Sequence, residues 1–243
     1  MIKNISIMML DKRIYERGSY LHNTIEELLG SYPIIDTRTL ISGDGVRLKN
    51  QEYHNIDPDP NDHTDVRTLE FYKQWHWGTG VSAWRHYCAF LTHKKIIKLA
   101  IKNKWDNFLL LEDDAVFTSR FHDVMGQVYQ QMPSQWDIIY LGWHAFEYDN
   151  HRLAGRNLEY EKHYKETGNA WLEPIQQCGG LFAAWINSSL YNRILAMPPI
   201  APIDSQLNYY REEITSLNVV PMAMYTASGF SNCENQDIIR DIL

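Results

Sequence analysis

Three consecutive carboxylates, Glu112, Asp113 and Asp114, follow directly on an apolar segment that ends at Leu111. Adjacent carboxylates repel one another and suit a strand poorly, so a fold that keeps them together usually supplies a cation or hydrogen-bond donors. Carboxylate oxygens are the ligands that Mg²⁺ and Mn²⁺ prefer, and such an ion can also bind the phosphates of a nucleotide. The triplet therefore predicts a divalent-cation site, with a solvated acidic turn as the alternative for so short a motif.

The elements around the triplet must place it where a ligand can reach it. Residues 108–111 have the length and composition of a buried strand, and a helical pattern over residues 81–102 precedes them. Another helical pattern, over residues 117–131, follows the triplet and ends before Pro133. In open parallel α/β sheets, ligands bind beyond the carboxyl ends of the strands, and the triplet has that position.

The alternation of strand and helix continues along the chain. Strands are predicted over residues 2–10, 32–36, 137–141, 179–185 and 218–225, and further helices over residues 14–29, 187–197 and 204–216. This order predicts an α/β fold with a Rossmann-like, mostly parallel sheet flanked by helices. No internal repeat or linker divides the chain, so we expect a single domain over residues 1–243.

Composition limits the partners. A net charge of -7 argues against binding to nucleic acid, which requires a basic surface, whereas a nucleotide remains possible if a divalent cation bridges it to the acidic protein. No apolar run is long enough to predict a transmembrane segment. Three widely spaced cysteines and the lack of a leader-like start favour a reducing, cytoplasmic location.

Several short motifs occur in a specific order. They are Leu10-Asp11-Lys12-Arg13 with Arg17 a turn later, Phe90-Leu91-Thr92-His93, the acidic triplet, Trp136-Asp137-Ile138-Ile139-Tyr140-Leu141-Gly142, Gly179-Gly180 and Pro202-Ile203-Asp204. This ordered set resembles glycosyltransferase family 25, the lipopolysaccharide and collagen galactosyltransferase-like group. The chain departs from the family's pattern at Cys88, where glycine is common, and at Thr92, where serine is common, and residues 50–80 match nothing in it.

The resemblance implies a GT-A type fold and a metal-dependent transfer of a sugar from a nucleotide-sugar donor, preferably a UDP-sugar, to a hydroxyl of a glycan or glycoconjugate acceptor, with inversion. It implies that Glu112 and Asp114 bind Mn²⁺ or Mg²⁺. Residues expected to bind the donor are Leu10, Asp11, Arg13, Arg17, Asp36, Glu112, Asp113, Gly179 and Gly180. For the two arginines, the alternative is a surface position on the first turn of a helix.

An inverting transfer needs a base from a segment other than the metal motif. Asp204 meets this requirement by residue type and by the resemblance, and its alternative role is the N-cap of the helix that follows. His93 is the other catalytic candidate, although a histidine on an apolar helix face is more often a packing residue. Glu147 is a further candidate.

Two other functions remain open from the sequence. One is a non-catalytic relative that binds carbohydrate or nucleotide, because a fold does not imply an activity. The other is a metal-dependent phosphodiesterase, which would also use a carboxylate cluster but usually draws its ligands from several separate segments.

Overall fold

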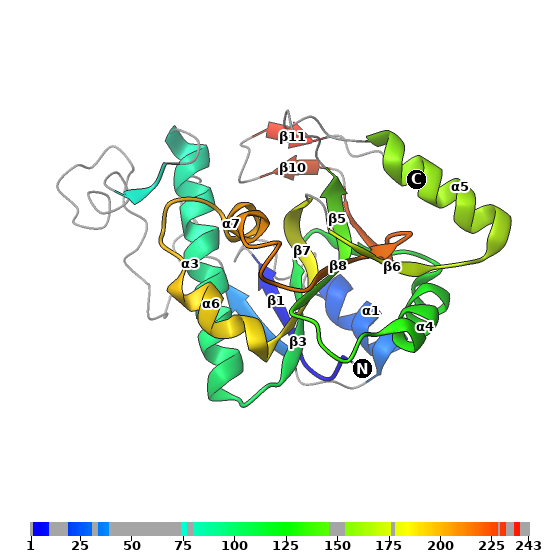
Figure 1. The fold of residues 1–243 in the computed structure, drawn as a ribbon. Coiled ribbons are helices and arrows are strands. Elements are labelled where there is room, and N and C mark those ends of the chain that lie inside the picture. The colour runs from blue at the N-terminus through cyan, green and yellow to red at the C-terminus, as the bar shows by residue number, and fades with distance from the viewer. Residues whose placement is uncertain are drawn as a thin grey trace.

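The computed structural model describes residues 2–9, 19–30, 34–38, 74–76, 80–145, 154–175, 178–227, 229–231 and 236–238. A seven-stranded sheet forms the centre of the fold (Figure 1), with the strand order β2-β1-β3-β7-β5-β8-β6. Its strands are β1 (Ile5–Met9), β2 (Ile34–Arg38), β3 (Asn107–Glu112), β5 (Ile138–Ala145), β6 (Trp171–Pro174), β7 (Cys178–Asn187) and β8 (Ser216–Val220).

The sheet is mixed, so the prediction of a mostly parallel, Rossmann-like sheet is wrong. β1 pairs in parallel with β2 and β3, and β5 pairs in parallel with β8. In contrast, β7 is antiparallel to both β3 and β5, and β6 is antiparallel to β8. A run of apolar residues predicts a buried strand but carries no information about its direction, which depends on the path of the connections. The fold class is therefore mixed α/β.

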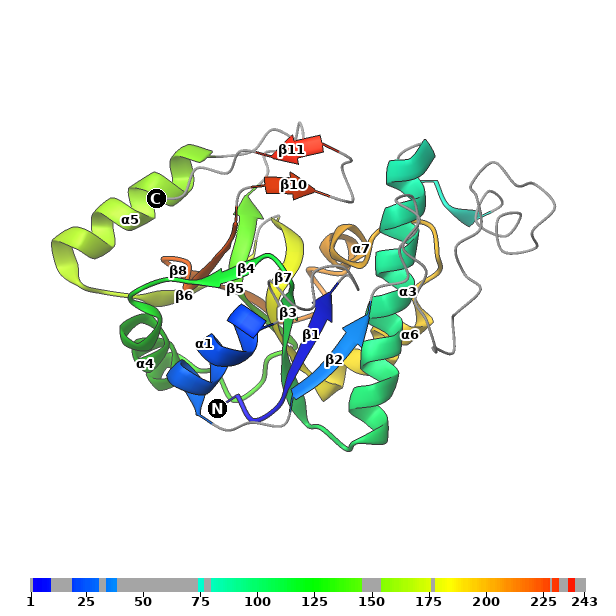
Figure 2. The ribbon, with the colours of Figure 1, turned by 180° about the vertical axis from the view of Figure 1, so that it is seen from behind.

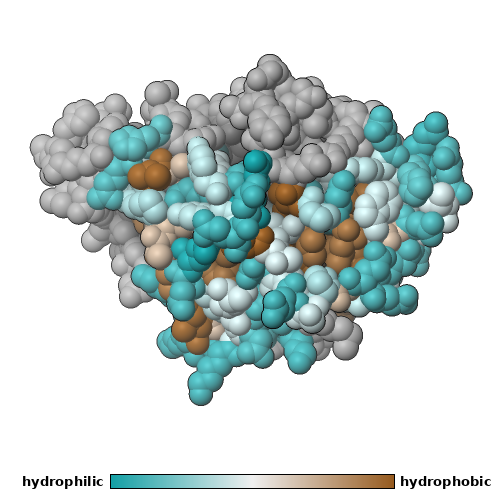
Figure 3. All heavy atoms as spheres, viewed as in Figure 1, coloured by the Kyte–Doolittle hydropathy of each residue, from teal (hydrophilic) through white to brown (hydrophobic). Residues whose placement is uncertain are grey.

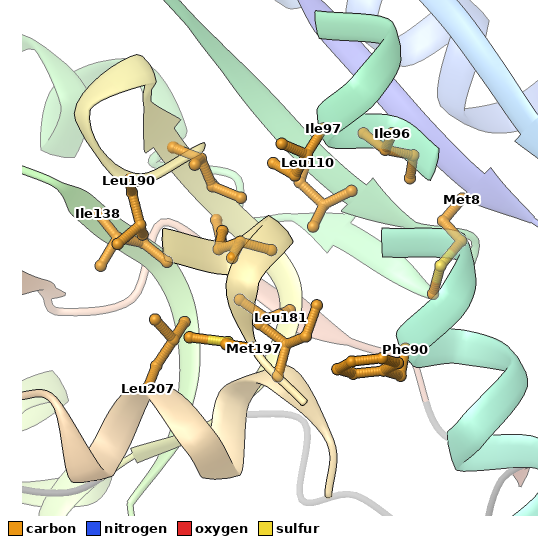
Figure 4. Packing of buried hydrophobic residues seen from close by; sticks show 14 of the residues in the cluster. Met8, Phe90, Ile96, Ile97, Leu110, Ile138, Leu181, Leu190, Met197 and Leu207 are labelled. Carbon is orange, nitrogen blue, oxygen red and sulfur yellow. The ribbon is translucent and has the colours of Figure 1, made fainter. Parts of the chain in front are cut away.

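Helices cover both faces of this sheet (Figures 1 and 2). α3 (Gly80–Lys102), α6 (Tyr191–Ala196) and α7 (Ile203–Tyr209) pack on one face. α1 (Ser19–Leu29) and α4 (Phe121–Gln131) pack on the other. Figure 4 shows the first core, in which Leu181 of β7 and Met197 lie between Leu207 of α7 and Phe90 of α3. This core determines where α3 and α7 lie relative to the sheet.

Several predicted elements differ from the observed ones. The helix predicted over residues 117–131 begins only at Phe121, because Phe117 belongs to β4 (Ala115–Phe117), which pairs with β9 (Met224–Thr226). The strand predicted over residues 218–225 is interrupted at Pro221, which has no backbone N–H to donate. The helix predicted over residues 204–216 ends at Tyr209. The structure also contains α5 (Ala154–Thr167), η3 (Ser188–Leu190), β10 (Gly229–Ser231) and β11 (Gln236–Ile238).

The described surface is mostly hydrophilic on the face shown in Figure 3, where apolar side chains form separate small patches. Within the described residues, the large apolar side chains that are exposed are Tyr20, Ile101, Ile200 and Tyr209. None of the described helices combines the length and the hydropathy needed to cross a bilayer.

Gly142 of β5 has no room for a side chain. A Cβ atom there would lie 2.3 Å from Cε2 of Phe182 and 2.5 Å from the carbonyl oxygen of Met224. We expect Gly142→Ala to lower the free energy of unfolding by about 2 kcal/mol or more, because a backbone oxygen and a core ring would have to move. Urea denaturation followed by circular dichroism measures this change.

Gly126 of α4 provides the matched control, because a Cβ atom there meets nothing within 4 Å. Alanine is the better helix former, so Gly126→Ala should raise the free energy of unfolding by up to about 1 kcal/mol. Equal effects of the two substitutions would contradict the packing described for Gly142.

Candidate active site

Among the described residues, several that could perform chemistry lie at one end of the sheet, which is called the edge below. β1, β2, β3, β5 and β8 run in one direction and β7 runs in the other, so the carboxyl ends of those five strands meet the amino end of β7. At this edge Glu112 lies beside Met8 of β1, and Gly179 lies beside His144 of β5. A ligand at this edge can therefore contact residues from several strands.

The acidic triplet is part of the folded edge and is not a solvated turn. The side chain of Glu112 is 31% exposed, Asp113 is buried at 9% exposure, and atom Oδ1 of Asp114 is buried. The next residue, Ala115, pairs with Thr226, and the N–H of Ala227 donates a hydrogen bond to the backbone oxygen of Asp114 at 2.8 Å. The carboxylates are thus fixed between the end of β3 and the β4–β9 pair.

His93 of α3 faces this triplet. It is 8% exposed, and its Nε2 lies 3.8 Å from Oε1 of Glu112. Burial lowers the pKa of His93 to about 4, although the charge of Asp204 and a hydrogen bond to the backbone of Ala89 act in the opposite direction. His93 is therefore neutral at neutral pH.

Asp204 lies in the first turn of α7 and connects that helix to the sheet. Its Oδ2 accepts a hydrogen bond from the N–H of Gly180 at 2.8 Å, and its Oδ1 accepts one from the N–H of Ser205 at 2.9 Å. The N-cap of α7 is Pro202, so the alternative role of Asp204 as the N-cap is wrong. The structure instead joins Asp204 to Gly180 near the amino end of β7, and the charge of Asp204 acts to raise the pKa of His93.

The Gly179-Gly180 pair begins β7 in a conformation that requires glycine. Gly180 has a φ of +87°, and a Cβ atom there would lie 3.0 Å from Cδ1 of Phe182 and 3.1 Å from Cδ2 of His144. Gly179 is buried opposite His144. The rings of Phe182 and His144 therefore leave little room for a side chain at position 180.

His144 is a site-edge residue that the sequence analysis did not identify. It lies near the carboxyl end of β5, is partly exposed, and its ring centroid is 5.1 Å from that of Phe182. The same signal that pointed to the triplet, a polar residue near the end of an apolar strand, could have identified it.

Some predicted residues cannot be placed at the site. Leu10, Asp11, Arg13, Arg17 and Glu147 lie outside the described residues. Asp36 is in β2 with its backbone beside Ile7 of β1, and its side chain is outside the described part. Within the described residues, no group of three or more His, Cys, Asp or Glu side chains could hold a metal ion.

Comparisons with known proteins add the following. The model of the family described as glycosyltransferase family 25 (LPS biosynthesis protein) matches residues 15–183. None of the curated proteins matches the chain.

Similar solved structures include A197 from STIV, with 8% sequence identity and a TM-score of 0.43. The match covers 100% of this chain and 96% of that chain. Mouse xyloside xylosyltransferase 1 in its apo form has 10% identity and a TM-score of 0.34, covering 86% of this chain and 60% of that chain. At these TM-scores neither likeness carries an argument about function.

Proposed function

The chain belongs to glycosyltransferase family 25 and is a glycosyltransferase, and from this premise we propose that its donor is a nucleotide-sugar, preferably a UDP-sugar. The acceptor is a hydroxyl of a glycan or glycoconjugate, the anomeric configuration is inverted, and a divalent cation, Mn²⁺ or Mg²⁺, assists the transfer. The enzyme has a GT-A type fold in this proposal.

One observation carries the proposal. The acidic triplet and Asp204 come from different elements, β3 and α7, and lie at the same edge of the sheet. His93 links them, because its Nε2 lies 3.8 Å from Oε1 of Glu112 and the charge of Asp204 acts on its pKa. A single-displacement transfer needs one set of groups for the leaving diphosphate and a separate base for the acceptor. This edge supplies both kinds of group.

Glu112 and Asp114 are the residues that would bind the cation. Mg²⁺ at a nucleotide site is usually held by one or two carboxylates together with substrate phosphates and water, so two carboxylates without a complete protein cage suit such a site. The buried Nε2 of His93, which has no hydrogen-bond partner and faces Glu112, also suits a site where a cation is shared. When bound, the ion supplies Lewis-acid stabilisation of the charge that develops on the departing diphosphate.

The chain's own residues perform the remaining steps in this proposal. Asp204 accepts the proton of the acceptor hydroxyl while the new bond forms between that oxygen and the anomeric carbon and the bond from the anomeric carbon to the diphosphate breaks. Each of its carboxylate oxygens keeps a second lone pair after accepting one backbone hydrogen bond, and the two N–H groups fix its orientation.

The donor lies on the β1 and β2 side of the triplet in this proposal. Arg13 and Arg17 would bind phosphate through their guanidinium groups, a recognition for which arginine is well suited. The other proposed donor contacts are Leu10, Asp11, Asp36, Asp113, Gly179 and Gly180.

Thermal unfolding with a panel of nucleoside diphosphates, each with and without Mn²⁺, tests the proposal. UDP together with Mn²⁺ should raise the melting temperature by about 5 °C or more at saturating concentrations, and either component alone should raise it less. The reason is that the acidic edge repels a bare diphosphate until a cation joins the two.

Each other result has a distinct meaning. Full stabilisation by UDP without metal would contradict the proposed role of the cation. Stabilisation by another nucleoside diphosphate in place of UDP would contradict the proposed preference for a UDP-sugar donor. Metal-dependent binding without donor turnover would favour the non-catalytic relative.

A further inference from the structure

The second half of α3 carries a row of lysines on one face. Lys94, Lys98 and Lys102 follow one another at intervals of four residues, and Lys95 lies beside Lys98 on the same side of the helix. α3 contains no aspartate or glutamate, although the whole chain has a net charge of -7. Positive charge is therefore concentrated on this face of an otherwise acidic protein.

An exposed apolar side chain lies among these lysines. Ile101 is 44% exposed, and Lys98 and Lys102 are exposed on either side of it. Figures 1 and 2 both show the carboxyl-terminal end of α3 at an outer corner of the described fold. We call Lys94, Lys95, Lys98, Ile101 and Lys102 the lysine face. It combines positive charge with one apolar side chain at a place that a large, flat partner can reach.

The lysine face contains repulsion that the fold does not relieve. Like charges four residues apart on a helix repel one another, and within the described residues no carboxylate forms an ion pair with Lys94, Lys98 or Lys102. Burial lowers the pKa of Lys94, and the charge of Lys98 lowers it further. Nζ of Lys94 donates a hydrogen bond to the carbonyl oxygen of Met197 at 2.6 Å, which fixes this charge beside the end of α6. The stability of the helix alone does not account for this arrangement.

The dipole of α3 explains only part of it. Cations are favourable in the last turn of a helix, where Lys102 lies. The effect falls off within that turn, whereas Lys94 and Lys95 lie about two turns before the end. A negatively charged partner, in contrast, would interact favourably with all four lysines.

We propose that the lysine face binds the surface of a bilayer that contains anionic phospholipids, with Ile101 entering the boundary between the headgroups and the acyl chains. Clusters of four or more lysines on a helix suit such surfaces. An apolar side chain that enters the bilayer adds to the electrostatic attraction. This inference goes beyond the proposed function and does not depend on it.

Two properties of the protein bear on the choice of partner. Ile101 favours a bilayer over a nucleic acid, because the phosphate backbone of a polynucleotide offers charge but no apolar layer for it to enter. The net charge of -7 does not prevent contact with an anionic surface. Charges further from the surface than about 10 Å are largely screened at an ionic strength of about 0.1 M, so the lysine face dominates where it touches the lipid.

Co-sedimentation of the whole protein with unilamellar vesicles tests the inference. Vesicles in which about one third of the lipid is phosphatidylglycerol should bind the protein, and vesicles of phosphatidylcholine alone should bind it at least about tenfold more weakly. Raising the salt concentration from about 0.05 M to about 0.5 M should weaken the binding, because it screens the attraction. Absence of binding to the anionic vesicles, or equal binding to both kinds, would overturn the inference.

The double variant Lys98→Gln with Lys102→Gln should lower the affinity for the anionic vesicles about 25-fold, since each lysine near such a surface contributes about fivefold. Its melting temperature should stay the same or rise, because glutamine is as good a helix former as lysine and removes the repulsion. A merely stabilising role of these lysines predicts the opposite change in melting temperature.

Lys162→Gln with Lys165→Gln is the matched control, because it removes the same charge from exposed positions on α5. Its affinity for the vesicles should change by less than about twofold, since these lysines lie outside the lysine face. Equal losses in the two double variants would show that only the net charge matters and would overturn the assignment to α3.

Ile101→Gln distinguishes a bilayer from other polyanions. It should weaken vesicle binding about threefold or more, because the apolar contact is lost, and it should not change any residual binding to a double-stranded RNA of random sequence. A protein that binds this RNA more tightly than the vesicles, with the same dependence on Lys98 and Lys102, would show that the partner is a nucleic acid and would overturn the inference.

Discussion

Asp114→Asn is expected to lower the rate of sugar transfer by at least about three orders of magnitude, because the amide keeps the shape of the carboxylate but loses the charge that holds the cation. The near-isosteric change suits the partly buried position of Asp114 at the β3–β4 turn. The measurement is release of the nucleoside diphosphate from a UDP-sugar in the presence of Mn²⁺. Thermal unfolding should remain cooperative, which shows that the loss is not a failure to fold.

Asp123→Asn is the control for this experiment. Asp123 is an exposed acid in the first turn of α4, and removing its charge should leave the transfer rate unchanged. An excess of a metal chelator should reproduce the effect of Asp114→Asn in the wild-type enzyme. Full activity in Asp114→Asn, in Asp114→Ala or in the chelator would show that the acidic triplet does not bind an essential cation.

Asp204→Asn is expected to reduce the chemical rate by roughly two to four orders of magnitude and to leave donor binding intact, because an amide cannot accept a proton at neutral pH. The structure adds an expected effect on stability. Asn has one acceptor oxygen, so it cannot replace both carboxylate oxygens that bond the N–H groups of Gly180 and Ser205. We expect a loss of about 1–2 kcal/mol in the free energy of unfolding.

Asp137→Asn separates the catalytic effect of the Asp204 change from its structural effect. Asp137 also accepts two hydrogen bonds, from the N–H of Thr215 at 2.8 Å and from the hydroxyl of Ser189 at 2.5 Å. It lies just before β5, at the opposite end of that strand from the candidate site. Its replacement should cost similar stability without changing the transfer rate in single-turnover measurements. Near-normal turnover in Asp204→Asn would leave Asp204 with only the role of joining α7 to β7.

Elements with a strong apolar pattern could be predicted from the sequence. β1, β3 and α3 occur where the pattern placed them, since a run of buried side chains or a helical apolar spacing is a local property. α5 was not predicted because it has no apolar stripe. It packs against the two cores through Tyr160 and Tyr164 and also makes polar contacts, because Glu161 forms an ion pair with Arg120 and the hydroxyl of Tyr160 donates to Glu173 at 2.7 Å.

The placement of a candidate site residue could be predicted from local sequence only where the residue directly follows an apolar strand. The triplet at the end of β3 is such a case. The hydrogen bond between Asp204 and Gly180 joins residues 24 positions apart, and the approach of His93 to Glu112 depends on how α3 packs on the sheet. Neither contact follows from local spacing, because both arise from the strand order and from the core between the helices and the sheet.

The position of β7 between two other strands affects how often its backbone can open. β7 has a hydrogen-bonded neighbour on each side, β3 and β5, so opening its backbone requires both ladders to break. Such a central strand exchanges its amide hydrogens only in the rarest openings of a protein, whereas short peripheral helices open far more often. Hydrogen exchange should therefore be slowest in β7 among the described strands, and Asp204 of α7 is joined to this slowly exchanging strand through Gly180.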